Sequence, residues 1–129
     1  MDKYIEVVAK VRIPNQKIQD MIICAVEGGS NYWGQFAFPQ NYKDKYGSYE
    51  QIPFKGGNIE VMDIETGELL GILNRATVQT GLQLMAHCKD VKGKHVPNRH
   101  FKNLAMDNED AETADVFMQL CVMGEIVYG

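Results

Sequence analysis

The sequence lacks the features of several specialised protein classes. Its 129 residues carry a formal net charge of −4, so it has no basic surplus of the kind that binds long nucleic acid. Its three cysteines, Cys24, Cys88 and Cys121, have no paired spacing, which predicts buried thiols in a reducing compartment and no disulfide framework. Because no apolar run reaches about 18 residues, we expect neither a membrane span nor a signal peptide.

Catalytic and metal-binding motifs are also missing from the sequence. His87, Cys88, His95 and His100 lack the close paired spacing of a zinc site. There is no Gly-x-Ser-x-Gly elbow, and no serine, histidine and acid stand together. The acids crowd one predicted helix start, where negative charge is favourable, and form no clear acid–base pair. We therefore expect no metal, no cofactor and no catalytic residue, which favours a binding protein over an enzyme.

Hydrophobic periodicity predicts both strands and helices. The composition, 45% hydrophobic and 23% charged, is that of one globular domain spanning residues 1–129. Alternation predicts a strand over residues 1–14, and strands are also predicted at 30–39, 58–64, 68–73 and 125–128, with a hairpin turn at 65–67. Residues 40–51 and 90–98 are predicted as loops.

Helical spacing with start and stop signals predicts three main helices. The first covers residues 16–27, with Asn15 as its N-cap and Gly28 and Gly29 as a left-handed end. The second follows a cap at Asn74, the third covers 110–123 and stops at Gly124, and a short helical turn is predicted at 99–106. Without a βαβ rhythm, this order predicts an α+β fold, a mostly antiparallel sheet packed with two or three helices.

Charge is unevenly distributed near the end of the chain. Residues 89–102 hold five basic side chains against one acid, and residues 107–115 hold five acids and no base. One interpretation is a solvated loop followed by a helix start that favours negative charge. The other is an anion site built from Arg99, His100 and Lys102, with Arg75 as a further donor, because arginine matches phosphate geometry.

Polar residues interrupt the otherwise apolar third helix. Glu112, Asp115 and Gln119 form a row on it, and buried polar groups need partners. Those partners are either structural hydrogen bonds, to loops or to a second subunit, or the hydroxyls and amines of a ligand read by Asp115 or Asn108. The apolar surface of this helix also suggests burial against a second copy of the chain.

Three aromatic side chains are candidates for stacking on a base. Tyr32 and Trp33 point to opposite faces of a predicted strand, so at most one is core and the other is available to stack on a base or a partner. Phe101 lies between the basic loop and the acidic helix start, where it could stack on adenine. Asn108 either caps the third helix or reads the adenine edge with its amide.

Two stretches resemble a known family of small phage proteins. They are Ile-Ile-Cys-Ala-Val-Glu-Gly-Gly-Ser-Asn-Tyr-Trp at residues 22–33, and Asp-Ala-Glu-Thr-Ala-Asp-Val-Phe-Met-Gln-Leu at residues 110–120, continuing to Gly-Glu-Ile-Val-Tyr-Gly at 124–129. The chain is similar in these stretches to the first Thoeris anti-defence family. Residues 121–123 depart from the family pattern, which tends to have Ala-Leu-Phe there.

The resemblance implies a sponge that binds a cyclic ADP-ribose-type immune signal without cleaving it, in the cytoplasm of the infected bacterium. Some members of that family also capture cyclic oligonucleotide signals of the CBASS system. It further implies a homo-oligomer, a dimer or a hexamer made as a trimer of dimers. The candidate ligand-binding residues are Trp33, Arg75, Asn98, Arg99, His100, Phe101, Lys102, Asn108 and Asp115. Two alternatives stay open: an enzyme that degrades the same signals, and a protein-binding inhibitor of a host defence factor.

Overall fold

Helix α5 (Ala111–Met123) lies at the centre of the fold in the computed structural model, which describes residues 3–108 and 110–129. Nine of the ten residues from Thr113 to Val122 are buried, all except Asp115, because helices α1, α3 and α4 and strand β3 surround this helix. The Asp110 carboxylate caps it by accepting a hydrogen bond from the Thr113 amide at 2.8 Å. Gly124, at φ 74°, ends it, so the predicted helix is confirmed.

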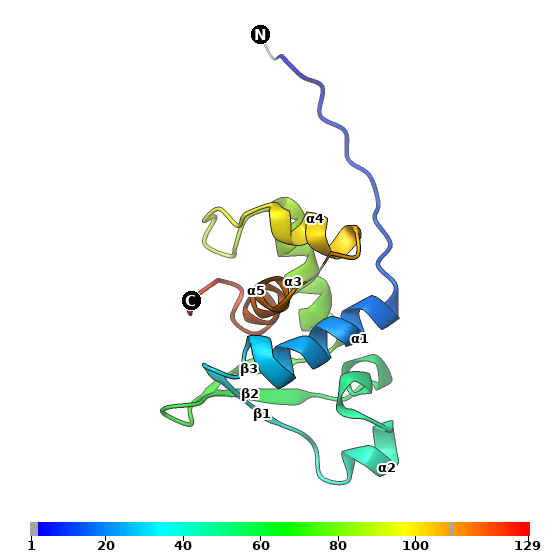
Figure 1. Ribbon diagram of the computed structural model, residues 1–129, viewed down its shortest axis with the longest axis vertical. Coiled ribbons are helices and arrows are strands. Elements are labelled where there is room, and N and C mark those ends of the chain that lie inside the picture. Colours follow the sequence, from blue (N-terminus) through cyan, green and yellow to red (C-terminus); the bar gives the residue numbers. More distant parts are fainter. Residues whose placement is uncertain (1–2, 109) are drawn as a thin grey trace.

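A three-stranded antiparallel sheet lies on one side of this helix layer (Figure 1). Its strands are β1 (Gly34–Ala37), β2 (Ile59–Asp63) and β3 (Leu69–Leu73), in that order across the sheet. The Asp63 side chain shapes the β2–β3 turn by accepting hydrogen bonds from the amides of Glu65 and Thr66. The α+β class is therefore confirmed, with five α-helices in the described ranges.

The remaining helical segments pack around α5 or lie at one end of the sheet (Figure 1). The Asn74 side chain accepts from the Thr77 amide while Thr77 accepts from the Asn74 amide, a capping box that starts α3 as predicted. The bounds are α1 (Asn15–Cys24), a π-helical continuation η1 (Ala25–Gly29), α2 (Tyr42–Tyr46), η2 (Tyr49–Gln51), η3 (Pro53–Lys55), α3 (Arg75–His87) and α4 (Arg99–Ala105).

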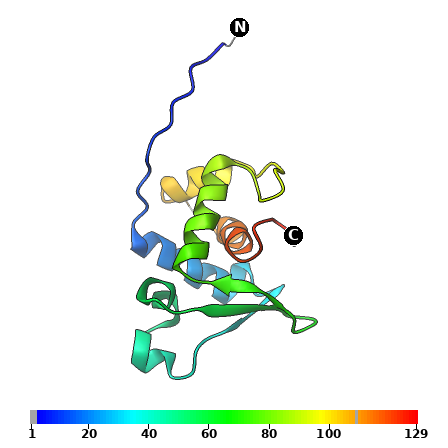
Figure 2. The same cartoon turned by 180° about the vertical axis from the view of Figure 1, so that it is seen from behind.

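The first predicted strand is wrong over the residues that the structure describes. Residues 3–13, here called the arm, are extended but pair with no other described segment, and they run from α1 past α3 and α4 on the side away from the sheet (Figures 1 and 2). Ile5 is 91% exposed and Val8 fully so. Alternation supplies the side-chain pattern of a strand, but a strand also needs a neighbour to complete its hydrogen-bond ladder.

The last predicted strand, residues 125–128, is also wrong. The amides of Val127 and Tyr128 donate to Gln119 Oε1 at 2.8 and 2.9 Å, so a side chain takes the place of a neighbouring strand. The Tyr128 hydroxyl donates to Asp63 Oδ2 at 2.8 Å, and this bond holds the pKa of the Asp63 carboxyl below its ordinary value. The chain end is thereby tied to both α5 and β2.

Three smaller predictions need correction. The loop predicted at 40–51 contains α2 and η2, in which Tyr46 is buried. Asn15 is the first residue of α1, and Pro14 takes the N-cap position. Neither Gly28 nor Gly29 adopts a left-handed conformation, because the helix widens to a π turn and ends at Ser30.

Gly29 is required for close packing against α5. A Cβ atom at this position would lie 2.6 Å from the Ala111 carbonyl oxygen, and main-chain atoms cannot move aside as a flexible side chain can. The neighbouring Gly28 has no heavy atom within 4 Å of the same position. There is therefore room for a side chain at position 28 but not at position 29, although the two glycines are adjacent in the sequence.

We expect Gly29→Ala to lower the free energy of unfolding by about 1–3 kcal/mol, because the added methyl group overpacks the contact with α5. Gly28→Ala is the matched control and should keep or slightly raise stability, since alanine favours helical backbone. Urea denaturation followed by Trp33 fluorescence measures both. Equal stability of the two variants would show that the contact at Gly29 does not constrain the fold.

Candidate functional site

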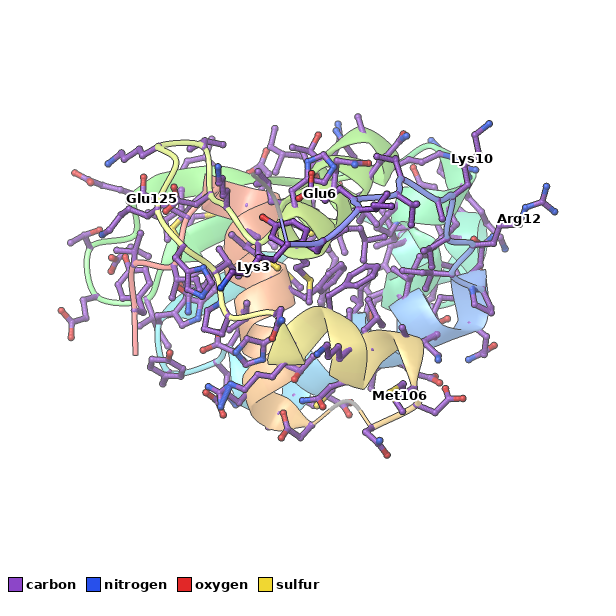
Figure 3. All side chains as sticks on the ribbon, turned by 90° about the horizontal axis from the view of Figure 1, so that it is seen from above. Lys3, Glu6, Lys10, Arg12, Met106 and Glu125 are labelled. Carbon is purple, nitrogen blue, oxygen red and sulfur yellow. The ribbon has the colours of Figure 1, made fainter. Side chains whose placement is uncertain are left out.

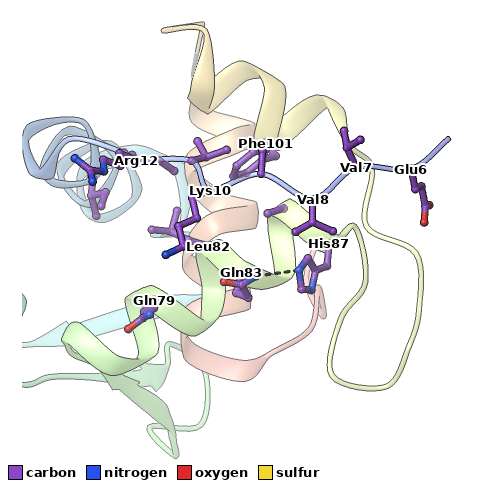
Figure 4. A pocket seen from close by; sticks show the side chains of 15 residues that line it. Glu6, Val7, Val8, Lys10, Arg12, Gln79, Leu82, Gln83, His87 and Phe101 are labelled. Atoms are coloured by element: carbon purple, nitrogen blue, oxygen red, sulfur yellow. Dashed lines mark hydrogen bonds between the residues drawn. The ribbon is translucent and has the colours of Figure 1, made fainter.

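A groove of about 850 Å³ lies between the arm and helices α3 and α4 (Figure 4). This volume is within the usual range for small-molecule sites. One wall consists of arm residues 6–13 and the other of the last three turns of α3 with the ring of Phe101 from α4. The side chains that line it include Lys10, Gln79, Leu82, Gln83, His87 and Phe101.

Polar groups line the groove at regular helical spacing. Gln79, Gln83 and His87 are four residues apart on α3, so all three lie on the face of the helix that meets the arm. Gln83 Nε2 and His87 Nε2 are 2.9 Å apart, which fixes the amide and the ring relative to each other. Lys10 belongs to the opposite wall, so the groove has a cation on the arm side and this polar row on the α3 side (Figure 4).

Phe101 is the candidate residue from the sequence that lines the groove. It is half-buried and packs against the core, so its ring is held by its surroundings. Its neighbour His100 is 2% exposed and points toward α5, with His100 Nδ1 3.1 Å from Thr113 Oγ1. Because successive helical residues differ in direction by about 100°, anchoring His100 on α5 turns Phe101 toward the groove.

The contact between α4 and α5 also occupies Arg99. Its guanidinium pairs with the Glu112 carboxylate at 2.7 Å, and both side chains are more than half exposed. Asn103 adds a third link by donating to Thr113 Oγ1 at 3.2 Å. Burial first, and then the Arg99 charge, lower the pKa of His100 below its ordinary value of 6.5. His100 therefore favours the neutral form and joins two helices inside the protomer.

The Asp115 carboxylate is the centre of a second polar cluster. Three side chains from the turn after η1 donate to it, Ser30 at 2.8 Å, Tyr32 at 2.7 Å and Trp33 at 2.7 Å. Gln119 donates to it from the next turn of α5 at 3.2 Å. Of the two alternatives for the polar row of this helix, the structure gives the first, because every member has a partner within the chain.

Trp33 is part of this cluster and of the core. It is 2% exposed, and its ring stacks on Tyr128 with centroids 5.2 Å apart. Tyr32 is the exposed member of the pair, but its hydroxyl is held by Asp115. Both residues precede β1, so their separation into core and surface comes from a turn, not from strand alternation.

The other candidate residues are exposed and lie outside the groove. Arg75 begins α3, two turns before Leu82, the first aliphatic groove residue of that helix. Asn98 occupies the N-cap position of α4 without a side-chain cap bond, and Lys102 follows on the same helix. Asn108 does not cap α5, since Asp110 does. The backbone N–H of Asn108 donates to the Asn103 carbonyl oxygen at 2.7 Å.

The thiols and acids do not gather into a metal site in the described ranges. No group of three or more His, Cys, Asp or Glu side chains there could hold a metal ion. Cys121 is buried, and burial raises the pKa of its thiol, whereas Cys24 and Cys88 are only half-buried, which corrects the expectation for those two. None of the described helices is long and apolar enough to cross a membrane.

The residues that sequence reasoning missed are Lys10 and the polar stripe of α3. The i, i+4, i+8 spacing of Gln79, Gln83 and His87 is a readable sign of one exposed helix face. What the sequence did not indicate is that the arm lies opposite this face. Comparisons with protein-family models, with curated proteins and with solved structures give no match to this chain.

We expect Asp115→Ala to lower the free energy of unfolding by about 3 kcal/mol, because three buried donors, Ser30, Trp33 and Gln119, lose an acceptor. Asp115→Asn should cost less, since one acceptor oxygen remains. Glu112→Ala, on the same helix, is the matched control and should change stability by less than about 1 kcal/mol, as exposed ion pairs do. Urea denaturation of the three variants tests this order, and a larger loss for Glu112→Ala would contradict it.

His100 should make stability depend on pH. Its pKa is lower in the folded chain than the ordinary value of 6.5, so the unfolded chain takes up this proton first as the pH falls. The stabilisation is therefore fully present above pH 6.5 and decreases as the pH falls below that value toward the folded-state pKa. We expect His100→Asn to flatten the decline in unfolding free energy as the pH falls below 6.5.

The measurement is urea denaturation across this range, and the slopes are compared, not the absolute stabilities, because the variant also loses the bond to Thr113. His95→Asn is the control, since His95 is exposed. A slope unchanged in His100→Asn would show that this ring does not carry the effect.

Proposed function

We propose that this protein is a phage anti-defence sponge, which binds and sequesters a cyclic ADP-ribose-type signal without cleaving it and so blocks Thoeris defence. The observation that carries the proposal is the groove, in which an aromatic ring, a row of side-chain amides and a cation face one space of nucleotide size. The resemblance of residues 22–33 and 110–129 to the Thoeris anti-defence family supports the same class of ligand.

The aromatic ring supplies the contact for a base. Phe101 is fixed through its neighbour His100, which is buried against α5, so the ring loses little freedom when a ligand binds. Stacking on an adenine would then contribute about 1–3 kcal/mol. Leu82 lines the same wall and extends the apolar surface on which a base would lie.

The polar groups supply contacts for the sugar and the phosphates. Gln79 and Gln83 present side-chain amides, which both donate and accept and so match ribose hydroxyls. His87, held beside Gln83, adds a ring nitrogen. Lys10 and Arg12 are the cations on the opposite wall, which makes them the candidates for a phosphate contact.

The decisive experiment mixes the purified protein with a cyclic ADP-ribose isomer, removes free ligand, heats the complex and analyses what is released. A sponge returns the intact cyclic molecule in the amount bound. An altered molecule would identify an enzyme, and the absence of any nucleotide would leave a protein-binding inhibitor. A cyclic oligonucleotide tested in the same way shows whether the CBASS signals are also captured.

We expect Phe101→Ala to weaken binding of the cyclic ADP-ribose isomer about ten- to a hundredfold, because the stacking surface is lost. Isothermal titration calorimetry measures the affinity, and the melting temperature shows whether the fold survives. Phe54→Ala is the matched control, a half-buried phenylalanine that does not line the groove, so it should lower stability without changing affinity. Wild-type affinity in folded Phe101→Ala would place the ligand elsewhere.

A further inference from the structure

The arm carries a series of exposed apolar side chains. Four aliphatic side chains on it are exposed by more than half, Ile5 by 91%, Val7 by 84%, Val8 fully and Val11 by 58%. Such a series is unusual on the surface of a monomer, and a contiguous one marks an interaction site. By contrast α5, which the sequence indicated as the face toward a second copy, is buried within its own chain.

The arm also has the two faces of a β-strand. Ile5, Val7, Ala9, Val11 and Ile13 form one face, which is wholly apolar, and the other carries Tyr4, Glu6, Val8, Lys10 and Arg12. Its backbone is extended, and no backbone hydrogen bond joins residues 3–13 to the rest of the described chain. A free extended edge of this kind is a template for pairing with another strand.

The strand that the arm needs is not available within the protomer. The arm leaves α1 on the side of the molecule opposite the sheet, as both views show (Figures 1 and 2), so it does not reach the edge of β1 or β3 in its own chain. Viewed from above, the arm crosses over the helices, with Lys3 and Glu6 over the middle of the molecule and Lys10 and Arg12 at its edge (Figure 3), so another chain can approach it from outside.

The sequence of the arm is complementary to itself when two copies run antiparallel. We propose that the arm pairs with the arm of a second copy about a twofold axis through Val8, and that this ribbon is the dimer interface of the protein. In this register Glu6 lies opposite Lys10 of the second copy, twice by symmetry, and Tyr4 lies opposite Arg12, a cation–π pair.

The same register places the apolar faces together. Ile5 then lies opposite Val11 and Val7 opposite Ala9, so aliphatic side chains from both copies form one continuous surface. A two-stranded ribbon alone is marginally stable, but this one would lie beside the groove, where other apolar lining residues, Ile18 and Ala86, can cover part of its apolar face. Pairing centred on Lys10 instead would oppose two lysines, which is unfavourable.

A crosslinking experiment tests the register. Val8→Cys lies on the twofold axis, so mild oxidation should convert most of this variant to a disulfide-linked dimer, because directly opposed side chains are within reach of a disulfide. Arg12→Cys is the matched control on the same strand face, and two copies of it lie about 26 Å apart in this register, so it should not crosslink with itself. A mixture of Tyr4→Cys and Arg12→Cys should crosslink.

Charge reversal gives an independent test by sedimentation equilibrium of the protein alone. We expect the wild type to sediment as a dimer of its 14.6 kDa chain. Glu6→Lys should raise the dimer dissociation constant at least tenfold, because the new side chain then lies opposite Lys10 of the second copy, twice by symmetry. Glu6→Lys together with Lys10→Glu in one chain should restore dimers.

Three outcomes would overturn the proposal: a monomeric wild type at micromolar concentration, equal crosslinking of Val8→Cys and Arg12→Cys, or loss of dimers in the double reversal. Because no nucleotide is present in these measurements, they remain separate from the test of the sponge. A dimer that binds no nucleotide would contradict the proposed function and leave the ribbon intact.

Discussion

The hydrogen bonds to the Asp115 carboxylate connect segments that lie far apart in the sequence. Ser30, Tyr32 and Trp33 donate to it from the turn that leads into β1, and Gln119 donates from its own helix. Gln119 in turn accepts the amides of residues 127 and 128. A carboxylate in an otherwise buried helix needs this set of donors, so the positions of the first strand and the chain end depend on it.

The same requirement for partners explains the geometry beside the groove. Thr113 and His100 satisfy each other between α5 and α4, and this fixes the short helix α4 although it has no side-chain N-cap. Phe101 is positioned as a consequence, one residue further along. The polar contacts that hold α4 and α5 together therefore involve other side chains than those that line the groove. A substitution in the groove can then change binding without removing these contacts.

Most regular elements were predictable because their signals are local. The stop at Gly124 and the capping box at Asn74 each involve residues within four positions of one another. The turn between β2 and β3 is equally local. The candidate site was predicted less well, since of the residues chosen for charge or shape only Phe101 lines the groove. Arg99 and Asp115 are engaged by groups that the sequence does not place near them.

By itself, the sequence determined the α+β class, the hairpin, the cap at Asn74, the stop at Gly124 and the burial of α5, because periodicity and capping act over a few residues. Only the tertiary structure decided that residues 3–13 stay unpaired within the chain, that Gln119 replaces a strand beside residues 127 and 128, and that Gly29 must lack a side chain beside Ala111. These outcomes depend on contacts between residues 8 to 82 positions apart, or on a partner strand that is missing from the chain, and a local pattern contains neither.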